Sequence, residues 1–336
     1  MTDLNKYRFC LAPMRGVTTV AYRNAFMNHF KGLDEAMAPF VPTVHADTVK
    51  PKLLKDIAPE INQSLPLIPQ IIGRDPHDFM VMADAVFALG YDEVNWNLGC
   101  PWKHVRKKKR GSGLLTHPDM LRAVLDPACE KYPGQISVKV RLGIGDNEAL
   151  QQIVPLFNDY PLKEVTIHPR TAEQMYDGTV DLDAFEAAYK ALTVPVAYNG
   201  DINDLAAFQQ LTERFPDIHH YMLGRGLLMN PFLCEILKTG EDNIDNKIER
   251  IRAFHSELCD AYKEEMFGDK PVLGKMKEMW KYLAAHLTNG KKLFKKVKKA
   301  NKVETYEQII EEYLTQAEWS DEIIWRGDVK ESQREE

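Results

Sequence analysis

The feature that most constrains the fold is a series of short apolar segments, separated by longer stretches of helical periodicity. Most of the segments end in glycine, proline or polar residues. Eight such segments occur, at residues 9–14, 35–40, 67–73, 93–99, 136–143, 164–169, 194–200 and 220–226. Short, mostly apolar runs are typical of parallel strands that are buried on both faces. The amphipathic stretches between them, such as 78–90 and 204–215, are expected to be helices.

This alternation predicts an α/β protein: an eight-stranded TIM (β/α)8 barrel followed by a smaller, all-helical C-terminal domain. The pattern extends over about 230 residues, close to the about 250 residues of a typical barrel. The alternative is an open doubly wound sheet. No GxGxxG motif follows the first apolar segment, however, so the barrel is favoured.

The alternation stops near residue 240, at the polar segment GEDNIDNK. From Ile248 to Leu314 the periodicity is helical and no strand pattern occurs. We therefore expect a barrel domain at residues 1–240 and a helical domain at 245–320. The highly charged residues 326–336 are expected to form a disordered tail.

Composition narrows the classes of protein. The five cysteines are scattered and form no CxxC pair, which fits a reducing cytoplasm and argues against a disulfide framework or a zinc site. No apolar run reaches the about 18 residues of a membrane span, and the N-terminus lacks the apolar core of a signal peptide. We expect a cytoplasmic monomer without a metal. The net charge of −6 means that any anionic partner must be bound by local basic patches.

In such a barrel the functional groups lie at the C-terminal ends of the strands. The last two apolar segments end in NGD (199–201) and GRG (224–226). Backbone N–H groups of glycine turns can approach a phosphate closely, and Arg225 can add a charge-assisted contact. The alternative is that these glycines only form tight turns. Their occurrence on two adjacent strands favours a phosphate site.

Three polar side chains lie in or next to apolar segments. Lys139 is costly to bury unless it meets an anion or an electron-rich ring, although an ion pair with Asp146 fits the spacing equally well. His168 either donates to a bound cofactor or is a satisfied, half-buried histidine. The Gln70 amide suits the polar edge of a ring, and otherwise caps a strand end.

Cys100 lies in a Gly-Cys-Pro turn after the fourth apolar segment, and this position predicts that it faces the barrel mouth. The other four cysteines are expected to be small buried hydrophobic residues. A thiol with an ordinary pKa of about 8.5 is mostly protonated at neutral pH and can act as a general acid. The basic residues that follow it would instead favour the thiolate.

Two basic patches stand out in this acidic chain. The first contains Lys103, Arg106, Lys107, Lys108, Lys109 and Arg110. The second contains Lys270, Lys275, Lys277, Lys281, Lys291, Lys292, Lys295, Lys296, Lys298, Lys299 and Lys302. One such patch alone is usually a solvated surface, but two of them favour a long polyanion that touches both domains. Trp102, Trp280 and Tyr282 are candidates for stacking on an unpaired base, although helical spacing makes Trp280 equally suited to the core.

Motifs throughout the chain resemble those of the flavin-dependent tRNA-dihydrouridine synthases, from about residue 9 to about residue 300. In the order of that family they are APMRGVTTVAYR, PQIIG, VNWNLGCPWK, GSGLL, SVKVRLG, TIHPRTAEQMYDG, VPVAYNGDI, LGRGLLMNP and GKMKEMWKYL. Each motif is weak alone, whereas the ordered set is specific.

The resemblance implies FMN in the barrel mouth, reduced by NADPH, and hydride transfer from the flavin to C6 of a uridine in the tRNA D-loop. Cys100 matches the thiol that protonates C5. The positions that match FMN contacts are Pro13, Met14, Arg15, Gln70, Lys139, His168, Asn199, Gly200, Asp201, Gly224 and Arg225. Asn97, Arg141 and Arg170 match positions near the base or the flavin. Lys107, Lys108 and Lys275, which belong to the two basic patches, are expected to contact the RNA. The helical domain would hold the tRNA while the target base is turned out of its loop.

The chain also departs from the family pattern. Asn95 replaces a usual aspartate, GVTT replaces GVTD at 16–19, Pro39 replaces an acidic residue, and Pro169 interrupts HGRT. The turn after Cys100 is usually glycine-rich and near neutral, but here it carries KKKR. We expect this run to point toward RNA phosphates and away from the sulfur. These departures affect the residues expected to contact the substrate, including those that determine which uridine is reduced.

Two other functions share parts of this pattern. An FMN barrel enzyme that reduces a small enone or pyrimidine needs the phosphate site but no lysine-rich helical domain. A non-catalytic RNA-binding protein would keep the barrel and bind no flavin.

Overall fold

The computed structural model describes residues 4–325, so the predicted tail at 326–336 lies outside the described residues. A single parallel sheet carries all the strands of this range. They are β1 (Arg8–Leu11), β2 (Glu35–Met37), β3 (Val41–Pro42), β4 (Leu67–Ile68), β5 (Gln70–Ile72), β6 (Val94–Leu98), β7 (Ile136–Arg141), β8 (Val165–His168), β9 (Val196–Asn199) and β10 (His220–Leu223). Their order is β3-β5-β6-β7-β8-β9-β10-β1-β2-β4.

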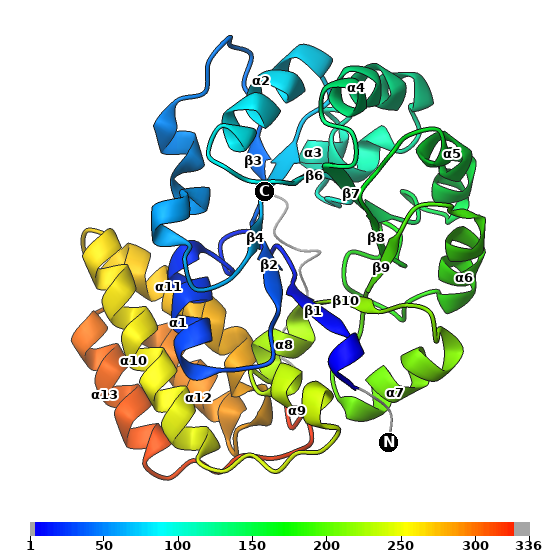
Figure 1. Cartoon of the computed structure of the whole chain (residues 1–336). Coiled ribbons are helices and arrows are strands. Elements are labelled where there is room, and N and C mark those ends of the chain that lie inside the picture. The colour runs from blue at the N-terminus through cyan, green and yellow to red at the C-terminus, as the bar shows by residue number, and fades with distance from the viewer. Residues whose placement is uncertain (1–3, 326–336) are drawn as a thin grey trace.

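The structure therefore has ten strands in this range where the sequence predicted eight. The predicted strand at 67–73 is divided by Pro69, which has no N–H to donate to the sheet. Its first half, β4, pairs with β2, and its second half, β5, pairs with β3 and β6. Because one residue joins β4 to β5, the two sides of the sheet meet, and the strands surround a common axis (Figure 1).

Helices cover the outside of this sheet (Figure 1). The longer ones are α1 (Val20–His29), α2 (Pro76–Phe87), α4 (Pro118–Lys131), α5 (Glu148–Asn158), α6 (Leu182–Ala191) and α7 (Leu205–Arg214). The short ones are α3 (Lys103–Arg106), α8 (Arg225–Met229) and α9 (Leu233–Thr239), with 3-10 turns at Leu4–Lys6, Pro51–Ile57, Pro59–Ile61 and Gly111–Leu114. Three helices begin at an aspartate whose carboxylate accepts the backbone N–H of the residue three positions later: Asp75, Asp181 and Asp204.

The region after Asn246 is helical, as its periodicity predicted. It contains α10 (Lys247–Glu265), α11 (Asp269–Leu283), α12 (Gly290–Lys299) and α13 (Val303–Leu314), with a 3-10 turn at Ala284–His286. Trp280 is fully buried and its indole N–H donates to the Tyr306 hydroxyl at 2.7 Å. Tyr282 is also buried. Neither ring is a stacking surface, so the helical spacing of Trp280 did indicate a core residue.

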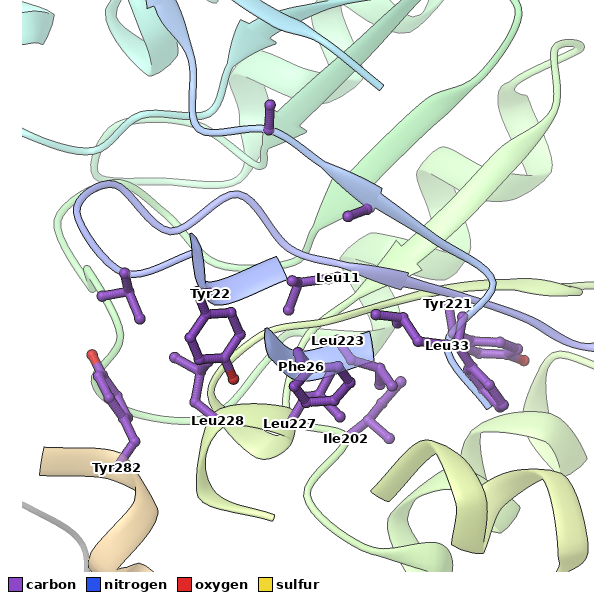
Figure 2. Close-up of a cluster of buried hydrophobic side chains, with 14 of the residues drawn as sticks. Leu11, Tyr22, Phe26, Leu33, Ile202, Tyr221, Leu223, Leu227, Leu228 and Tyr282 are labelled. Carbon is purple, nitrogen blue, oxygen red and sulfur yellow. The ribbon is translucent and has the colours of Figure 1, made fainter. Parts of the chain in front are cut away.

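An apolar interface joins the helical region to the barrel. Tyr282 of α11 lies beside Tyr22 of α1 and Leu228 of α8, and Phe26 of α1 stacks on the Tyr22 ring at 5.9 Å, on the side away from Tyr282 (Figure 2). The Tyr262 hydroxyl adds a 3.1 Å hydrogen bond to Thr19. This packing fixes the helices beside the start of α1, next to the loop that follows β1. Across residues 4–325, none of the helices has the length and apolar character required to cross a membrane.

Candidate functional site

A cavity opens at the carboxyl ends of the strands and encloses about 940 Å³, including the part open to solvent. We call it the mouth cavity. The residues that line it are Ala12, Pro13, Met14, Arg15, Phe40, Asn97, Gly99, Cys100, Pro101, Trp102, Lys139, Arg141, His168, Arg170, Tyr176, Asn199, Gly200, Asp201, Ile202, Asn203, Met222, Gly224, Arg225 and Gly226. Fourteen predicted site residues are among them. Gln70, Lys107, Lys108 and Lys275 are not.

The Cys100 turn is held from both sides. The Asn97 side-chain oxygen accepts the N–H groups of Gly99 at 3.1 Å and Cys100 at 2.8 Å. The Cys100 carbonyl accepts the Ser112 hydroxyl at 2.9 Å. Gly111, at φ +57°, lies so close that a Cβ there would be 2.7 Å from the Cys100 Cβ. The glycine of the GSGLL motif therefore allows the loop to pack directly behind the thiol.

The sequence predicted that Cys100 faces the barrel mouth, and it does line the cavity, but it is only 6% exposed. Burial raises the pKa of its thiol, while the Trp102 N–H, Arg141 and Arg15 lower it by smaller amounts. The thiol is therefore protonated at neutral pH. The basic run does not favour a thiolate, in line with the expectation that it points away from the sulfur. Lys107, Lys108 and Lys109 are exposed, and the charges that act on the sulfur are those of Arg141 at the end of β7 and Arg15 after β1.

Gln70 begins β5 and is fully buried, so it does not cap the end of a strand. Its amide oxygen accepts the Asn97 amide at 2.8 Å, and its amide nitrogen donates to Asn95 at 2.8 Å. Asn95 in turn donates to the Ser137 hydroxyl at 2.9 Å. This ladder of amides inside the barrel fixes Asn97 and, through it, the Cys100 turn. Gln70 thus supports the cavity from below without lining it.

Lys139 lies on β7 between the buried Val138 and Val140 and is the one partly exposed residue of that strand. Its ammonium donates to the Asn199 amide oxygen at 2.7 Å, whereas Asp146 accepts the backbone N–H of Glu148. The ion pair with Asp146 that the spacing allowed is therefore not formed. Burial, with a further contribution from Arg141, lowers the pKa of Lys139 to about 7. A bound anion at this point would restore its full charge.

His168 is neutral in this setting. Burial lowers the pKa of its imidazole well below the usual value, and the neighbouring charges of Arg141, Lys139, Arg170 and Arg225 lower it further. Arg170 lies 3.2 Å from the His168 Nε2 and has no acceptor atom, so Nε2 accepts and Nδ1 carries the proton. The histidine can therefore donate only one hydrogen bond, from Nδ1.

The glycine turns at 200 and 224–226 are built around arginines. Asp201, itself at φ +46°, pairs with Arg170 and, at 3.4 Å, with Arg225. A Cβ on Gly200 would come within 2.8 Å of Val180, and one on Gly226 within 2.1 Å of the Ile202 carbonyl oxygen. Gly226 is thus required for close packing of two backbone segments, whereas Gly200 packs against a side chain at a φ of +155°. The packing leaves backbone and guanidinium donors at the cavity wall, which is what a phosphate needs.

Several cavity residues were not predicted from the sequence, of which Tyr176 is the most informative. Its ring lies between two guanidinium groups, 5.3 Å from that of Arg141 and 5.0 Å from that of Arg225. The YDG within the TIHPRTAEQMYDG segment contained this residue, but nothing in its spacing placed it between two arginines. Phe40, which lies 5.6 Å from the Arg15 guanidinium, was likewise missed.

The three lysines predicted to contact RNA, Lys107, Lys108 and Lys275, lie outside the cavity. Lys107 and Lys108 are exposed just after α3, on the segment that follows the Cys100 turn. Lys275 is half-buried, and its ammonium donates to the Gly16 carbonyl at 2.8 Å, in the loop after β1. It therefore joins the helical region to the barrel beside Arg15. The six lysines of α12 are all exposed, while Leu293 and Val297 on its other face are buried.

These features define a class of protein. A parallel barrel holds, at the carboxyl ends of its strands, one protonated thiol and five cationic side chains around a single carboxylate. Such a cavity suits an anionic, phosphate-bearing cofactor and an acid that can give up one proton.

The model of the dihydrouridine synthase (Dus) family matches residues 10–318, and the chain belongs to this family. The tRNA-dihydrouridine synthase B of Pasteurella multocida is 29% identical over 237 residues, which cover 70% of each chain. The tRNA-dihydrouridine(16) synthase of Vibrio vulnificus is 27% identical over 325 residues, 93% of this chain and 99% of that one. A structure of morphinone reductase in complex with tetrahydroNAD shares the fold, with a TM-score of 0.51 at 9% identity over 74% of this chain and 90% of that one.

Proposed function

We propose that this chain is an FMN-dependent tRNA-dihydrouridine synthase that reduces the C5=C6 bond of a D-loop uridine, with NADPH as reductant. The observation that carries the proposal is the mouth cavity, which brings the protonated Cys100 together with Lys139 and the arginine-lined glycine turns. The family match and the relatives named as tRNA-dihydrouridine synthases support it.

The residues of the cavity fit a flavin mononucleotide. Gly200, Gly224 and Arg225 offer a close backbone approach and a fixed charge for the phosphate. Lys139 offers a positive charge for the part of the ring system that becomes anionic on reduction. Pro13, Met14 and Met222 supply apolar cavity wall for the ring. When bound, the reduced flavin supplies the hydride for C6 of the uridine.

The protein's own chemical task is then the proton for C5. Cys100 keeps its proton because burial disfavours the thiolate, and transfer to the uridine leaves a thiolate that Arg141 and Arg15 stabilise. A proton from solvent restores the thiol. Asn97 and Ser112 hold the cysteine backbone, so the sulfur does not swing away from the cavity as the base enters.

Binding of the tRNA is assigned to two surfaces. Lys107 and Lys108 lie beside the Cys100 turn, and the exposed lysines of α12 belong to the helical region. A tRNA that touches both can present a flipped-out uridine to the cavity between them. Lys275, held against Gly16, is proposed to fix the junction between these surfaces.

The barrel itself is proposed to be an eightfold one. β2 and β3 form one divided strand position, as do β4 and β5, because each half pairs with the corresponding half of its neighbour. The other six strands then give eight positions around the axis, the number of the (β/α)8 fold.

The decisive experiment measures dihydrouridine by nucleoside mass spectrometry in unmodified tRNA incubated with the protein, FMN and NADPH. We expect dihydrouridine with the parent protein, and mapping of the modified nucleotide would identify the uridine. Cyclohexenone is tested in parallel as a small enone. Its reduction without any tRNA product would favour the small-molecule alternative, and a protein that binds tRNA but no flavin would contradict both enzyme proposals.

A further inference from the structure

The opposite end of the barrel holds a second buried group of reactive side chains, which the proposed reaction does not use. Cys10 on β1, Glu35 on β2 and His220 on β10 each offer one ligand atom, and these atoms all lie within 4.8 Å of one another. The residues are 0%, 6% and 8% exposed. With Glu164, which contacts His220, we call them the floor cluster.

The orientation of His220 points to a missing partner. Its Nδ1 lies 2.7 Å from a Glu164 oxygen, which fixes the ring and directs Nε2 into the cluster. There Nε2 and a Glu35 oxygen are 2.9 Å apart. Both atoms are nevertheless buried without a hydrogen bond of acceptable geometry. The two atoms therefore form an ion pair whose geometry does not suit a hydrogen bond, and both remain available as ligands to a third body that binds beside them.

The donor set is that of a zinc ion. Thiolate, imidazole and carboxylate are its usual ligands, at about 2.0–2.3 Å, so neighbouring ligand atoms lie about 3.3–3.7 Å apart. A separation of 2.9 Å thus needs to open by only a few tenths of an ångström. Glu164 behind His220 and Arg8 on the other Glu35 oxygen are the hydrogen-bonding partners that hold metal ligands in place.

The charges of the cluster also suit a divalent cation. Two carboxylates, Glu35 and Glu164, contact His220, and Arg8 pairs with Glu35. Zinc is bound by the thiolate form of cysteine, so the Cys10 thiolate and Glu35 would together offset the charge of the ion. A single buried water can supply the fourth ligand.

We propose that Cys10, Glu35 and His220 form a structural Zn²⁺ site that ties the first strand of the barrel to the second and the last. No zinc site was predicted from the sequence because the scattered cysteines form no CxxC pair. Here the ligands are brought together across strands β1, β2 and β10, from positions far apart in the chain.

The test measures the zinc content of the full chain. The protein is first stripped of metal with a chelator and then dialysed to equilibrium against Zn²⁺. The bound zinc is then determined by mass spectrometry. We expect about one zinc per chain, lost in Cys10→Ser and His220→Gln. Cys129→Ser is the matched control, because Cys129 is another buried free cysteine and is 6% exposed. Zinc that persists in the first two variants lies elsewhere, for instance at the exposed Asp75 and His77, and overturns the proposal.

A second measurement needs no variant and so does not depend on the folding of the altered chains. The parent protein loaded with Co²⁺ should show the intense near-ultraviolet absorption of a thiolate–cobalt bond and the visible bands of a tetrahedral ion. Absence of the thiolate absorption overturns the site even if zinc is retained. We also expect zinc to raise the melting temperature of the parent and not that of Cys10→Ser.

Discussion

The two ends of the barrel hold the same kinds of side chain in opposite electrostatic surroundings. The mouth cavity contains Cys100 and His168 among lysine and arginine side chains. The floor cluster contains Cys10 and His220 between Glu35 and Glu164. Four basic residues act together with burial to keep His168 neutral, whereas Glu164, Glu35 and Cys10 outweigh burial and raise the pKa of His220 to about 12.

This difference shows that the residue type does not decide what a buried cysteine or histidine does. The charges that neighbouring strands bring to the same end of the sheet decide it. The cationic side chains of the mouth cavity favour the anionic cofactor that we propose, and they stabilise the thiolate that remains after Cys100 gives up its proton. The carboxylates of the floor cluster favour a cation, and there we propose cysteine and histidine as metal ligands.

The largest expected effect is on the rate of dihydrouridine formation, and it should differ between variants of Cys100 in the mouth cavity and of Cys10 in the floor cluster. Cys100→Ala should lower the rate of dihydrouridine formation by about 10²–10⁴-fold, because the proton donor is lost while flavin binding is kept. Cys10→Ser should retain most of the rate per bound flavin. Initial rates on unmodified tRNA, normalised to flavin absorbance, measure both. Equal losses in the two variants would mean that Cys100 has only a structural role.

The second effect concerns the charges of the mouth. Arg225→Gln removes a charged donor from the proposed phosphate site, and hydrogen bonds to charged groups contribute about 1.5–3 kcal/mol. We therefore expect FMN to bind about 10–100-fold more weakly, as measured by fluorescence titration. Arg8→Gln at the floor is the matched control, and its FMN affinity should be that of the parent. A similar loss in both variants would show that Arg225 acts through general stability.

The third effect concerns the free energy of unfolding, which we expect to change in opposite directions when a lysine of the mouth or a lysine of the floor is replaced. Lys139 is protonated in folded and unfolded chains below pH about 7, so the folded protein then bears the full cost of a buried charge. The cost disappears as pH rises toward about 10, where both states are neutral. Lys139→Met should therefore stabilise the flavin-free protein at pH 7, by on the order of 1–3 kcal/mol in urea unfolding, and by less at pH 9.

Lys163 at the floor provides the contrast. Its ammonium pairs with Glu93 at 2.8 Å, and this carboxylate outweighs burial and raises the pKa of the lysine. Lys163→Met should therefore destabilise the protein at pH 7, the opposite direction from Lys139→Met. If both substitutions change stability in the same direction, the electrostatic difference between mouth and floor is not what governs these lysines.

The smallest expected effect lies on the surface. Lys107→Gln with Lys108→Gln should weaken tRNA binding a few-fold and reduce the slope of log affinity against log salt by about 1–2. The same double change at Lys6 and Lys31, exposed near the N-terminal ends of β1 and β2, should leave both unchanged. Filter binding at several salt concentrations compares the pairs. If the slope of log affinity against log salt is unaltered in the Lys107 and Lys108 variant, the basic run does not contact the RNA.

Much of this protein could be read directly from its sequence. The apolar segments became strands, with ends within a few residues of the prediction, because strand formation in a buried sheet depends on local apolar character and on the turn residues that follow. The glycine turns and the Gly-Cys-Pro turn were located for the same reason. Their order along the chain placed them at one end of a parallel sheet, and the family motifs agreed.

Only the tertiary structure decided which of these groups meet. It divided a predicted strand at Pro69, buried Trp280, and turned Gln70 from a cavity residue into a support for Asn97. It also brought Cys10, Glu35 and His220 together. Burial and charge act through space, between strands that are distant in sequence, so the pKa of Cys100 depends on Arg15 and Arg141 and not on the lysines that follow it in the chain.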